Sequence, residues 1–412
     1  MPQNWKTYKL EDAIDSLIDY RGKTPKKTDS GIPLVTAKIV KRGTIQEPKE
    51  FIANEDYEKW MVRGFPEVGD VVLTTEAPLG EVAIIKDSNI ALAQRIITLR
   101  GKKGILDSKY LKYFLQSSIG QNRLIARESG TTVTGIKQSE LRKVLIDCPV
   151  YYEQKAIANI LSAIDAKIEN NLTINKILED MAMALYKEWF VDFGPFQDGK
   201  FVESELGMIP EGWEVKTVGE IGLNYKKTVK PSEIVDDVKY LGLEHFTKSS
   251  LSINEFGNGS EVSSNKFEFQ EGDILFGKLR PYFKKVGIAP YDGICSTDVL
   301  VIRPIKFFYY GLLIGLLIQD AFIDYCTLSS TGTRMPRTNW TSISEYKICL
   351  PTKKNVIQEF NGALFGSSRK ILQNIKQNQT LIQLRDTLLS KLISGEVRLN
   401  EFDLEEVLEG EI

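Results

Sequence analysis

The sequence predicts a mixed α/β (α+β) fold in which two globular domains are separated by two long antiparallel helices. Three observations predict it. Two long stretches without proline carry apolar residues at helical spacing, the second stretch repeats the first at a fixed offset, and short β-branched runs occupy much of the rest. Together these features indicate an internal repeat with approximate twofold symmetry, joined by a coiled coil.

The first long helix is expected from residue 153 to about residue 193. This stretch contains neither proline nor glycine, and its apolar residues recur in steps of three and four. The positions are Ile157, Leu161, Ile164, Ile168, Leu178, Met181 and Leu185. At ~1.5 Å per residue the helix would be roughly 60 Å long. It needs a partner to bury its apolar stripe.

The second long helix, expected at about residues 355–394, supplies that partner. Its apolar residues repeat those of the first helix after a shift of 203 residues, as Phe360 does after Ile157. Gly362 and Gly366 weaken its first turns. Two unrelated surface helices are the alternative, but the shared offset argues against it.

The globular domains repeat at nearly the same offset. Matching positions are Gly69 and Gly272, Pro78 and Pro281, and Pro149 and Pro351. The expected boundaries are 1–150 for the first domain, 151–195 for the first helix, 196–352 for a linker with the second domain, 353–400 for the second helix, and 401–412 for an acidic tail.

Within each domain we expect short strands followed by one helix and a last strand. Runs such as 71–73, 83–85 and 274–276 lie between Gly-Asp and Pro-Gly turn signals. The helices are expected near residues 108–118 and 310–325, and the last strands at 144–149 and 346–351. The order along the chain is therefore globular domain, helix, globular domain, helix.

Antiparallel pairing of the helices would bring their midpoints together. Four asparagines lie there: Asn171, Asn175, Asn374 and Asn378. The first would face the last, and the middle two would face each other. Polar residues at such a seam commonly fix the register of the helices. The alternative is that the asparagines flank the seam and that Leu172 and Ile375 lie inside it.

Composition indicates an ordinary soluble globular protein, with 42% hydrophobic and 26% charged residues. The four cysteines show no CxxC spacing, which favours a reducing, cytoplasmic location. The start lacks an apolar signal core, and the longest apolar run, 307–318, is too short to span a bilayer. A buried helix is the expected alternative for that run.

No catalytic residue, metal site or cofactor site is expected in this chain. A single histidine, His245, excludes HExxH and multi-histidine metal sites. The phosphate-loop pattern fails at residues 22–24 because the required earlier glycine is Leu17. No recognisable carboxylate pair occurs.

Several motifs resemble those of one family. Segment 185–193 (LYKEWFVDF) looks like its central conserved region, 207–213 (GMIPEGW) like the start of its second recognition domain, and 389–399 (LSKLISGEVRL) like its C-terminal end. Residues 153–157 (EQKAI) resemble the start of its first helix. The chain thereby resembles, over essentially its whole length, the specificity (S) subunit of type I restriction–modification enzymes. One departure is the degenerate start of the second helix at 355–360.

The resemblance implies a DNA-binding subunit without catalysis of its own. Each globular domain would be a target recognition domain that reads one half of a bipartite, asymmetric double-stranded site. The helices would set the spacer and dock two methyltransferase (M) subunits that use S-adenosylmethionine. Restriction (R) subunits, which use ATP and Mg, would join them. A protein-binding structural adaptor and a nuclease remain the alternatives.

Two basic segments are candidates for DNA contact. The net charge of −2 means that such a function depends on local patches or on partners. The first segment offers Lys23, Lys26, Lys27, Lys38, Lys41 and Arg42, and the second offers Lys278, Arg280, Tyr282, Lys284 and Lys285. Lysine and arginine suit phosphate contact, and arginine also reads guanine. Solvated loops are the alternative.

The repeat supports the second segment, because its counterpart in the first domain, 74–79, has different side chains, including Thr74 and Thr75. Two polar turn loops could also contact DNA. They contribute Thr131, Thr132, Lys137, Thr333, Arg334 and Arg337. The alternative for these loops is a structural turn before the last strand.

Large aromatic residues at the end of the first helix exceed what one helix pair needs to bury. Tyr186, Trp189 and Phe190 suit a partner interface. The alternative is that they seal the joint between the helix and the second domain. His245 and Trp340 are expected to pack rather than to bind a ligand.

Overall fold

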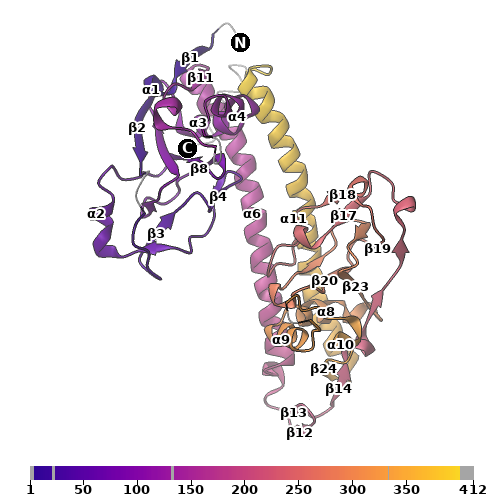
Figure 1. Cartoon of the computed structure of the whole chain (residues 1–412). Coiled ribbons are helices and arrows are strands. Elements are labelled where there is room, and N and C mark those ends of the chain that lie inside the picture. Colours follow the sequence, from indigo (N-terminus) through magenta and orange to yellow (C-terminus); the bar gives the residue numbers. More distant parts are fainter. Residues whose placement is uncertain (1–3, 21–23, 131–133, 333, 400–412) are drawn as a thin grey trace. The chain divides into compact units, whose positions relative to one another are not determined.

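The computed structural model describes residues 4–20, 24–130, 134–332 and 334–399 (Figure 1). The chain divides into two compact units, one formed by residues up to Lys167 together with those from Ile382 onward, and the other by Ile168–Leu381. Each unit therefore holds one globular domain and one part of each long helix. The mixed α/β class and the two long helices expected from the sequence are confirmed.

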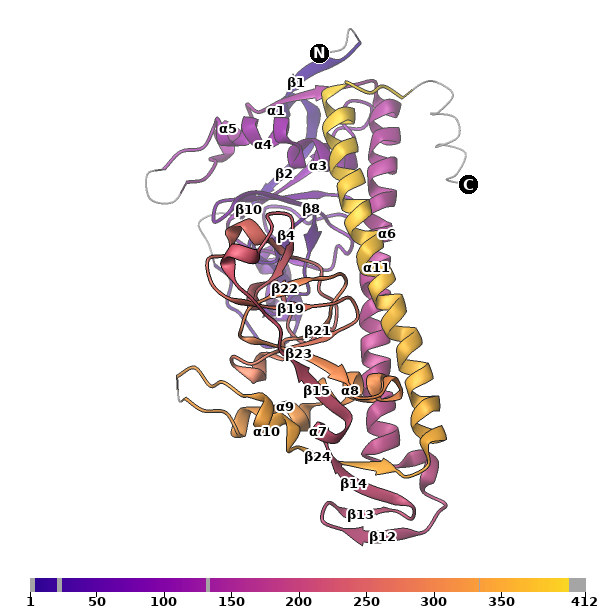
Figure 2. The same ribbon diagram turned by 90° about the vertical axis from the view of Figure 1, so that its right-hand side faces the viewer.

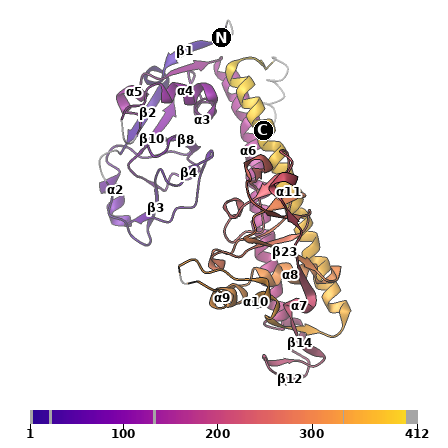
Figure 3. The same cartoon turned by 45° about the vertical axis from the view of Figure 1, so that its right-hand side comes forward.

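The first globular domain is built on a four-stranded antiparallel sheet in the order β2-β10-β7-β8, with a smaller sheet β6-β3-β9, a hairpin β4-β5 and the pair β1-β11. The strands are β1 (Lys6–Lys9), β2 (Ile14–Asp19), β3 (Ile32–Val35), β4 (Val40–Lys41), β5 (Thr44–Ile45), β6 (Phe51–Ile52), β7 (Val71–Thr75), β8 (Leu79–Ile84), β9 (Ala91–Leu92), β10 (Ile96–Gly101) and β11 (Leu145–Cys148). The helices are α1 (Leu10–Ala13), α2 (Tyr57–Trp60), α3 (Ser108–Gln116), α4 (Ser118–Ile125) and α5 (Gln138–Leu141). In Figure 3, β3 and α2 lie at one end of this domain, and α3 and α4 lie at the other.

The second globular domain repeats this plan with the sheet β15-β23-β20-β21, a five-stranded sheet β16-β19-β22-β17-β18, and the pairs β12-β13 and β14-β24. The strands are β12 (Phe201–Ser204), β13 (Gly207–Pro210), β14 (Trp213–Thr217), β15 (Gly222–Tyr225), β16 (Thr228–Val229), β17 (Lys239–Leu241), β18 (Gly257–Asn258), β19 (Lys266–Phe269), β20 (Ile274–Gly277), β21 (Val286–Ile288), β22 (Gly293–Cys295), β23 (Val299–Pro304) and β24 (Lys347–Pro351). The helices are α7 (Val218–Ile221), α8 (Tyr310–Leu317), α9 (Asp320–Leu328) and α10 (Trp340–Ser344).

The expected single helix of each domain is in fact two helices. In the first domain α3 ends at Ser117, whose backbone is extended and whose hydroxyl accepts the N–H of Gly120, so that it caps α4. In the second domain α8 and α9 meet at an angle of 76°. Taken singly, no helix in the described part of the chain has the length and apolar character needed to cross a membrane. Every residue of α8 is buried, as expected for the apolar run.

The long helices are α6 (Tyr151–Phe190) and α11 (Lys354–Ser394), and they pair antiparallel within each unit (Figures 1 and 2). In the first unit Ile157 of α6 and Leu392 of α11 share the core of the globular domain. In the second unit Phe360, near the start of α11, packs in one core with Phe190 at the end of α6. Each helix therefore buries its apolar stripe against its partner and a globular domain.

The seam of the second unit contains the asparagines. Asn171 donates its amide to the side-chain oxygen of Asn378, and Asn374 donates to that of Asn175, both at 2.8 Å. All four side chains are buried. Leu172 is 43% exposed, so the alternative that placed it inside the seam is wrong for α6, whereas Ile375 is buried beside the asparagines.

A carboxylate of α6, partly buried in the first unit and buried in the second, links each globular domain to the helices. In the first unit Asp165 of α6 accepts hydrogen bonds from Lys112 and Tyr113 of α3, both at 2.7 Å, and from Arg385 of α11 at 3.2 Å. In the second unit Glu179 of α6 accepts the hydroxyls of Ser250 and Ser252, at 2.9 and 2.8 Å.

Two of the sequence motifs that lie far apart in the chain meet in the first unit. The carboxylate of Glu153, at the start of α6, accepts two hydrogen bonds from the guanidinium of Arg398, at 2.7 and 2.9 Å. Glu153 is buried, so this bidentate pair fixes the segment after α11 against the start of α6.

Candidate nucleic-acid interface

The second basic segment forms the loop between β20 and β21. The N–H of Gly277 donates to the carbonyl of Lys285 at 2.8 Å, which closes the loop. Inside it, a 3-10 turn at Pro281–Phe283 is flanked by Arg280 and Lys284, which have φ of 52° and 48°. This left-handed backbone is unusual for residues with a side chain, and it is typical of positions held by their surroundings for a function.

The polar loop that precedes α10 lies against this β20–β21 loop. Leu279 forms a β-bridge with Arg337, and the N–H of Arg280 donates to the carbonyl of Pro336 at 2.7 Å. Thr338 donates its N–H to the carbonyl of Lys278 at 3.1 Å. The structure thus brings together Lys278, Arg280 and Arg337, which the sequence placed in two separate candidate segments.

Positive charge crowds around this pair of loops. Burial lowers the pKa of Lys278, Asp298 partly offsets that effect, and Arg337 and Lys226 lower the pKa further. Burial also lowers the pKa of Lys285, with a further contribution from Lys248. Like charges held close together favour an anion as their partner, and a nucleic-acid phosphate or base edge supplies one.

The sequence reasoning missed two members of this cluster, Lys226 and Lys248. Neither lies in the basic run 278–285, and only the fold brings them near it. The ammonium of Lys248 lies 4.0 Å from the ring centre of Phe283 in the loop. The adjacent lysines at 226 and 227 were the one available sequence signal.

The remaining candidate DNA-contact residues of the second domain differ in the exposure of their side chains and in the contacts that these side chains make. Tyr282 is 48% exposed, and Arg334 is exposed. Lys284 forms an ion pair with Asp320, and Lys285 donates to the carbonyl of Leu243 at 2.6 Å. Thr333 lies outside the described residues.

In the first domain the equivalent hairpin β7–β8 holds its two threonines inside. Thr74 is fully buried, donates its hydroxyl to the carbonyl of Pro78 at 2.6 Å and accepts the N–H of Glu81 at 2.9 Å. Thr75 is also buried. Both side chains are therefore buried within the hairpin rather than presented on the surface of the domain, and their assignment as DNA contacts stays a prediction.

The tip of that hairpin carries an acid instead. Glu76 forms an ion pair with Arg95 at 2.9 Å and a β-bridge with Gly135 of the neighbouring polar loop. Ala77 has φ of 51°, the same left-handed conformation as Arg280. The sequence reasoning missed Glu76 and Arg95, because it searched for clusters of bases.

The other candidates of the first domain are spread over its surface. Lys38, Lys41 and Arg42 are exposed near the hairpin β4–β5, and the N–H of Arg42 donates to the carboxylate of Glu81 at 2.7 Å. Lys137 is exposed at the N-terminus of α5. Lys23, Thr131 and Thr132 lie outside the described residues.

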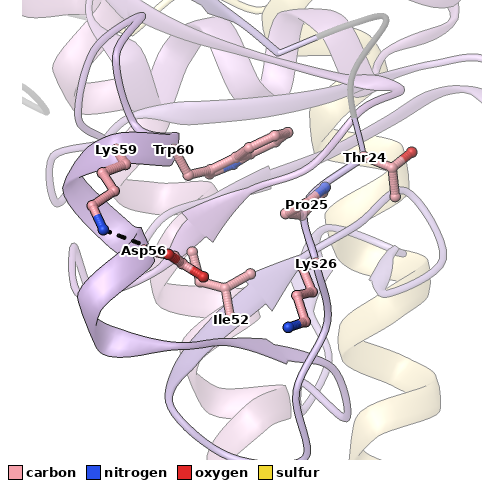
Figure 4. A pocket seen from close by; sticks show the side chains of 7 residues that line it. All are labelled: Thr24, Pro25, Lys26, Ile52, Asp56, Lys59 and Trp60. Carbon is pink, nitrogen blue, oxygen red and sulfur yellow. Dashed lines mark ion pairs between the residues drawn. The ribbon is translucent and has the colours of Figure 1, made fainter.

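Lys26 lines a shallow cavity of about 230 Å³ (Figure 4). The cavity is formed by Thr24, Pro25, Lys26, Ile52, Asp56, Lys59 and Trp60. The indole N–H of Trp60 donates to the carbonyl of Leu92 at 2.9 Å. The next candidate, Lys27, forms an ion pair with Glu50 at 2.8 Å.

The aromatic residues at the end of α6 serve the second domain itself. Tyr186 and Phe190 are buried in its core, and Phe190 packs edge-on against Phe360 with ring centres 4.7 Å apart. Trp189 is half-buried, 5.7 Å from the same ring. For Tyr186 and Phe190 the structure favours the second alternative, a sealed joint, because their apolar surface is already covered within the chain, whereas Trp189 keeps part of its surface exposed.

Metal and thiol chemistry find no support in the described residues. No group of three or more His, Cys, Asp or Glu side chains there is arranged to hold a metal ion. The four cysteines are buried, and burial raises the pKa of the Cys295 thiol to about 12. Such a thiol stays protonated and unreactive at neutral pH.

Comparison with known proteins places this geometry in a family. The family described as "Type I restriction modification DNA specificity domain" matches residues 2–180 and 210–384. The type I restriction enzyme MjaIX specificity subunit of Methanocaldococcus jannaschii is 30% identical, over 97% of this chain and 95% of its own length. The HindI specificity subunit of Haemophilus influenzae is 25% identical over 77% of this chain and 80% of its own. The crystal structure of the type I S subunit from M. genitalium superposes with a TM-score of 0.60 at 18% identity, covering 94% of this chain and 96% of that one, and so shares the fold.

Proposed function

We propose a detailed function for this chain on the premise that it belongs to the type I restriction–modification specificity subunits. It is the non-catalytic DNA specificity subunit of such a system. Beyond that, each globular domain reads one half of a bipartite, asymmetric target in double-stranded DNA. The paired helices α6 and α11 set the length of the spacer between the halves.

One observation carries this proposal: the same loop occurs twice, with different chemistry. The hairpin β7–β8 and the loop β20–β21 leave corresponding strands of corresponding sheets, and each is bridged to a polar loop. Ala77 and Arg280 share a left-handed backbone at the matching position. A duplicated frame with different tips is what two half-sites of different sequence require.

The helix seam supports a fixed spacer. The pairs Asn171–Asn378 and Asn175–Asn374 leave the side-chain oxygens of Asn171 and Asn374 buried without a donor among the described residues. Apolar residues would avoid this cost in stability. Buried asparagines at a seam are best explained by register, because a shifted pairing would leave more of their amides unpaired.

The helices also dock the partner subunits in this proposal. Two methyltransferase (M) subunits, which use S-adenosylmethionine, would bind along them, and restriction (R) subunits with ATP and Mg would join the complex. With Tyr186 and Phe190 buried, the exposed apolar side chains on α6 are better candidates for that contact. Ile177 and Met181, one turn apart, are 53% and 58% exposed.

The experiment that tests the proposal lengthens both helices. Seven residues are inserted in α6 between Lys167 and Ile168, and seven in α11 between Leu381 and Ile382. Seven residues preserve the heptad phase and add ~10 Å of helix, which is about three base pairs. The methylated sequences of a host that carries the variant and its M subunits are then mapped.

We expect both half-sites to be retained and the spacer between them to grow by about three base pairs. A matched control carries the insertion in α6 only, which breaks the pairing and should abolish methylation. An unchanged spacer with both insertions contradicts the proposal. An assembled complex that shows no salt-dependent affinity for DNA would favour a protein-binding adaptor instead.

A further inference from the structure

We propose that Arg280 is a specificity-determining residue and that it reads a guanine through the major groove in the half-site of the second domain. The inference rests on the proposed function, and it adds the identity of one residue and of the base that it reads. Three independent features of the described structure support it: the backbone at Arg280, the state of its guanidinium, and the charges around it.

The backbone at Arg280 is fixed before any ligand binds. Its N–H donates to the carbonyl of Pro336 at 2.7 Å, and its carbonyl accepts the N–H of Phe283 at 2.9 Å. The next residue, Pro281, is buried. A left-handed φ of 52° at a residue other than glycine is strained, and it persists because these contacts determine it. The side chain therefore projects from a rigid support, as precise base readout requires.

The guanidinium of Arg280 is not engaged by an acid. No carboxylate pairs with it among the described residues, and its Nε is buried without an acceptor. The neighbouring bases are occupied, because Arg337 is paired with Asp298 at 3.1 Å and Lys284 with Asp320. A buried N–H donor without a partner costs stability, and no acid in the described part of the chain competes with a ligand for the guanidinium.

The positively charged donors around Arg280 favour a base edge that presents hydrogen-bond acceptors. Lys278 and Arg337 lie in the two loops that hold Arg280, and Lys226 lies close to Lys278. An arginine offers donors only, and guanine presents two acceptors, O6 and N7, in the major groove. Adenine and cytosine place an amino group there, which would meet donors. The first domain carries Glu76 at its tip, an acceptor that suits those amino groups instead.

The first arm of the test maps the methylated target of the full chain, co-expressed with its M subunits, before and after Arg280→Ala. We expect one guanine of one half-site to become variable while the other half-site is unchanged. Arg334→Ala is the matched control. It removes the same charge from an exposed position in the adjoining loop, and it should weaken methylation without changing the sequence. Glu76→Gln should relax the half-site that Arg280→Ala leaves intact.

The second arm measures binding of the assembled complex to its mapped target with single guanines replaced by 7-deazaguanine, which lacks the N7 acceptor. At one position the wild-type complex should lose roughly ten- to hundred-fold in affinity, and the Arg280→Ala complex should lose no more. Relaxation by Arg334→Ala rather than Arg280→Ala, or a 7-deazaguanine loss that is equal in wild type and variant at every position, overturns the inference.

Different outcomes contradict the proposed function and the role of Arg280. A wild-type complex that methylates or binds no defined sequence contradicts the proposed function. A complex with a defined bipartite target whose guanines are all indifferent to Arg280→Ala contradicts this inference alone.

Discussion

The two globular domains share the same arrangement of four sheet strands, called the frame below, and differ at the tip of one loop, which joins β7 to β8 in the first domain and β20 to β21 in the second. In both domains a glycine with positive φ precedes the first strand of the hairpin. The aspartate directly after that glycine forms an ion pair with an arginine 30 residues later in the chain. These pairs are Asp70–Arg100 at 2.7 Å and Asp273–Arg303 at 2.6 Å. The glycines are Gly69 and Gly272.

At the tip the charges differ, because at the offset of 203 residues Glu76 corresponds to the uncharged Leu279, and Thr75 to Lys278. In the first domain an acid, Glu76, faces a base, Arg95, at 2.9 Å. At an offset of 203 residues, the position of Arg95 is taken by Asp298, whose carbonyl accepts the N–H of Lys278 at 2.8 Å in the second domain. The strands and the Asp–Arg pair occur in both domains because folding requires them. The residues at the hairpin tips are not needed for folding in this way, so they can differ with the DNA sequence that each domain reads.

The largest effect on stability is expected when the Asp–Arg ion pair of either domain is removed. Asp70→Ala and Asp273→Ala should each lower the free energy of unfolding by about 3 kcal/mol, because each removes the acceptor of a backbone N–H and the two-oxygen partner of a partly buried arginine. Arg100 keeps an exposed ion pair with Glu67 at 2.6 Å, which offsets little of that loss. Denaturant unfolding of the two variants checks this. If the frame is shared, the two losses agree within about 0.5 kcal/mol.

The matched control is Lys27→Ala, which removes an exposed ion pair with Glu50. Its effect on stability should stay within about 0.5 kcal/mol. A loss in one aspartate variant only would mean that the common geometry carries different weight in the two domains.

The next largest effect distinguishes Asp165 from Glu179 by the pH dependence of the stability that each contributes. Burial opposes ionisation of Asp165, but Lys112, Tyr113 and Arg385 outweigh it and hold its pKa below the ordinary value. The pKa of Glu179 is raised by burial, which the hydroxyls of Ser252 and Ser250 only partly offset. The two carboxylates should therefore stabilise their units in opposite pH ranges.

The signs follow from the direction of each shift. The contribution of Asp165 is present above its unfolded pKa of about 3.9 and is lost as the pH falls through the folded value. The contribution of Glu179 is complete below its unfolded pKa of about 4.3 and is lost as the pH rises through the raised folded value. Asp165→Asn should cost about 3 kcal/mol at pH 7, since Lys112 stays buried without a charged partner.

Glu179→Gln should cost less than about 1 kcal/mol at pH 7 and should remove the gain in stability that the wild type shows between pH 7 and pH 5. Unfolding curves of wild type and both variants at several pH values check this. A gain that persists in Glu179→Gln would show that another group is responsible.

The sequence predicted the long helices and their pairing far better than the positions of the candidate contact residues. Helical periodicity and the offset of 203 residues located both long helices within three residues of their observed ends, and antiparallel pairing placed Asn171 against Asn378. These features follow from regular spacing, which one sequence displays. The breaks at Ser117 and at Ile318–Gln319 were missed, because an interruption of one or two residues hardly disturbs a periodic pattern.

The candidate contacts were harder to predict for a physical reason. Whether a threonine or a lysine reaches solvent depends on loop closure, which periodicity does not report. Thr74 turned inward to hold its hairpin, whereas Lys226 was brought beside Lys278 from 52 positions earlier in the sequence. Tyr186 likewise entered the core of the second domain.

The smallest effect concerns the different charges at the two hairpin tips, and it tests the comparison between the domains directly. Lys278→Ala removes one positive charge from the β20–β21 loop. It should weaken DNA binding by the assembled complex about threefold to tenfold, similarly for target and unrelated duplexes, and reduce the slope of log affinity against log salt by about one. Assembly should be unaffected, because the side chain lies in the loop rather than on α6 or α11.

The corresponding change in the first domain should act in the opposite direction. Glu76→Gln removes a negative charge that repels phosphates, so affinity for unrelated duplexes should rise by a similar few-fold while the salt slope stays the same or steepens. Shift assays at several salt concentrations measure both slopes on the same DNA. Equal and parallel responses would show that the difference in charge between the tips has no part in DNA binding, because a tip that meets the duplex must respond to the sign of its own charge.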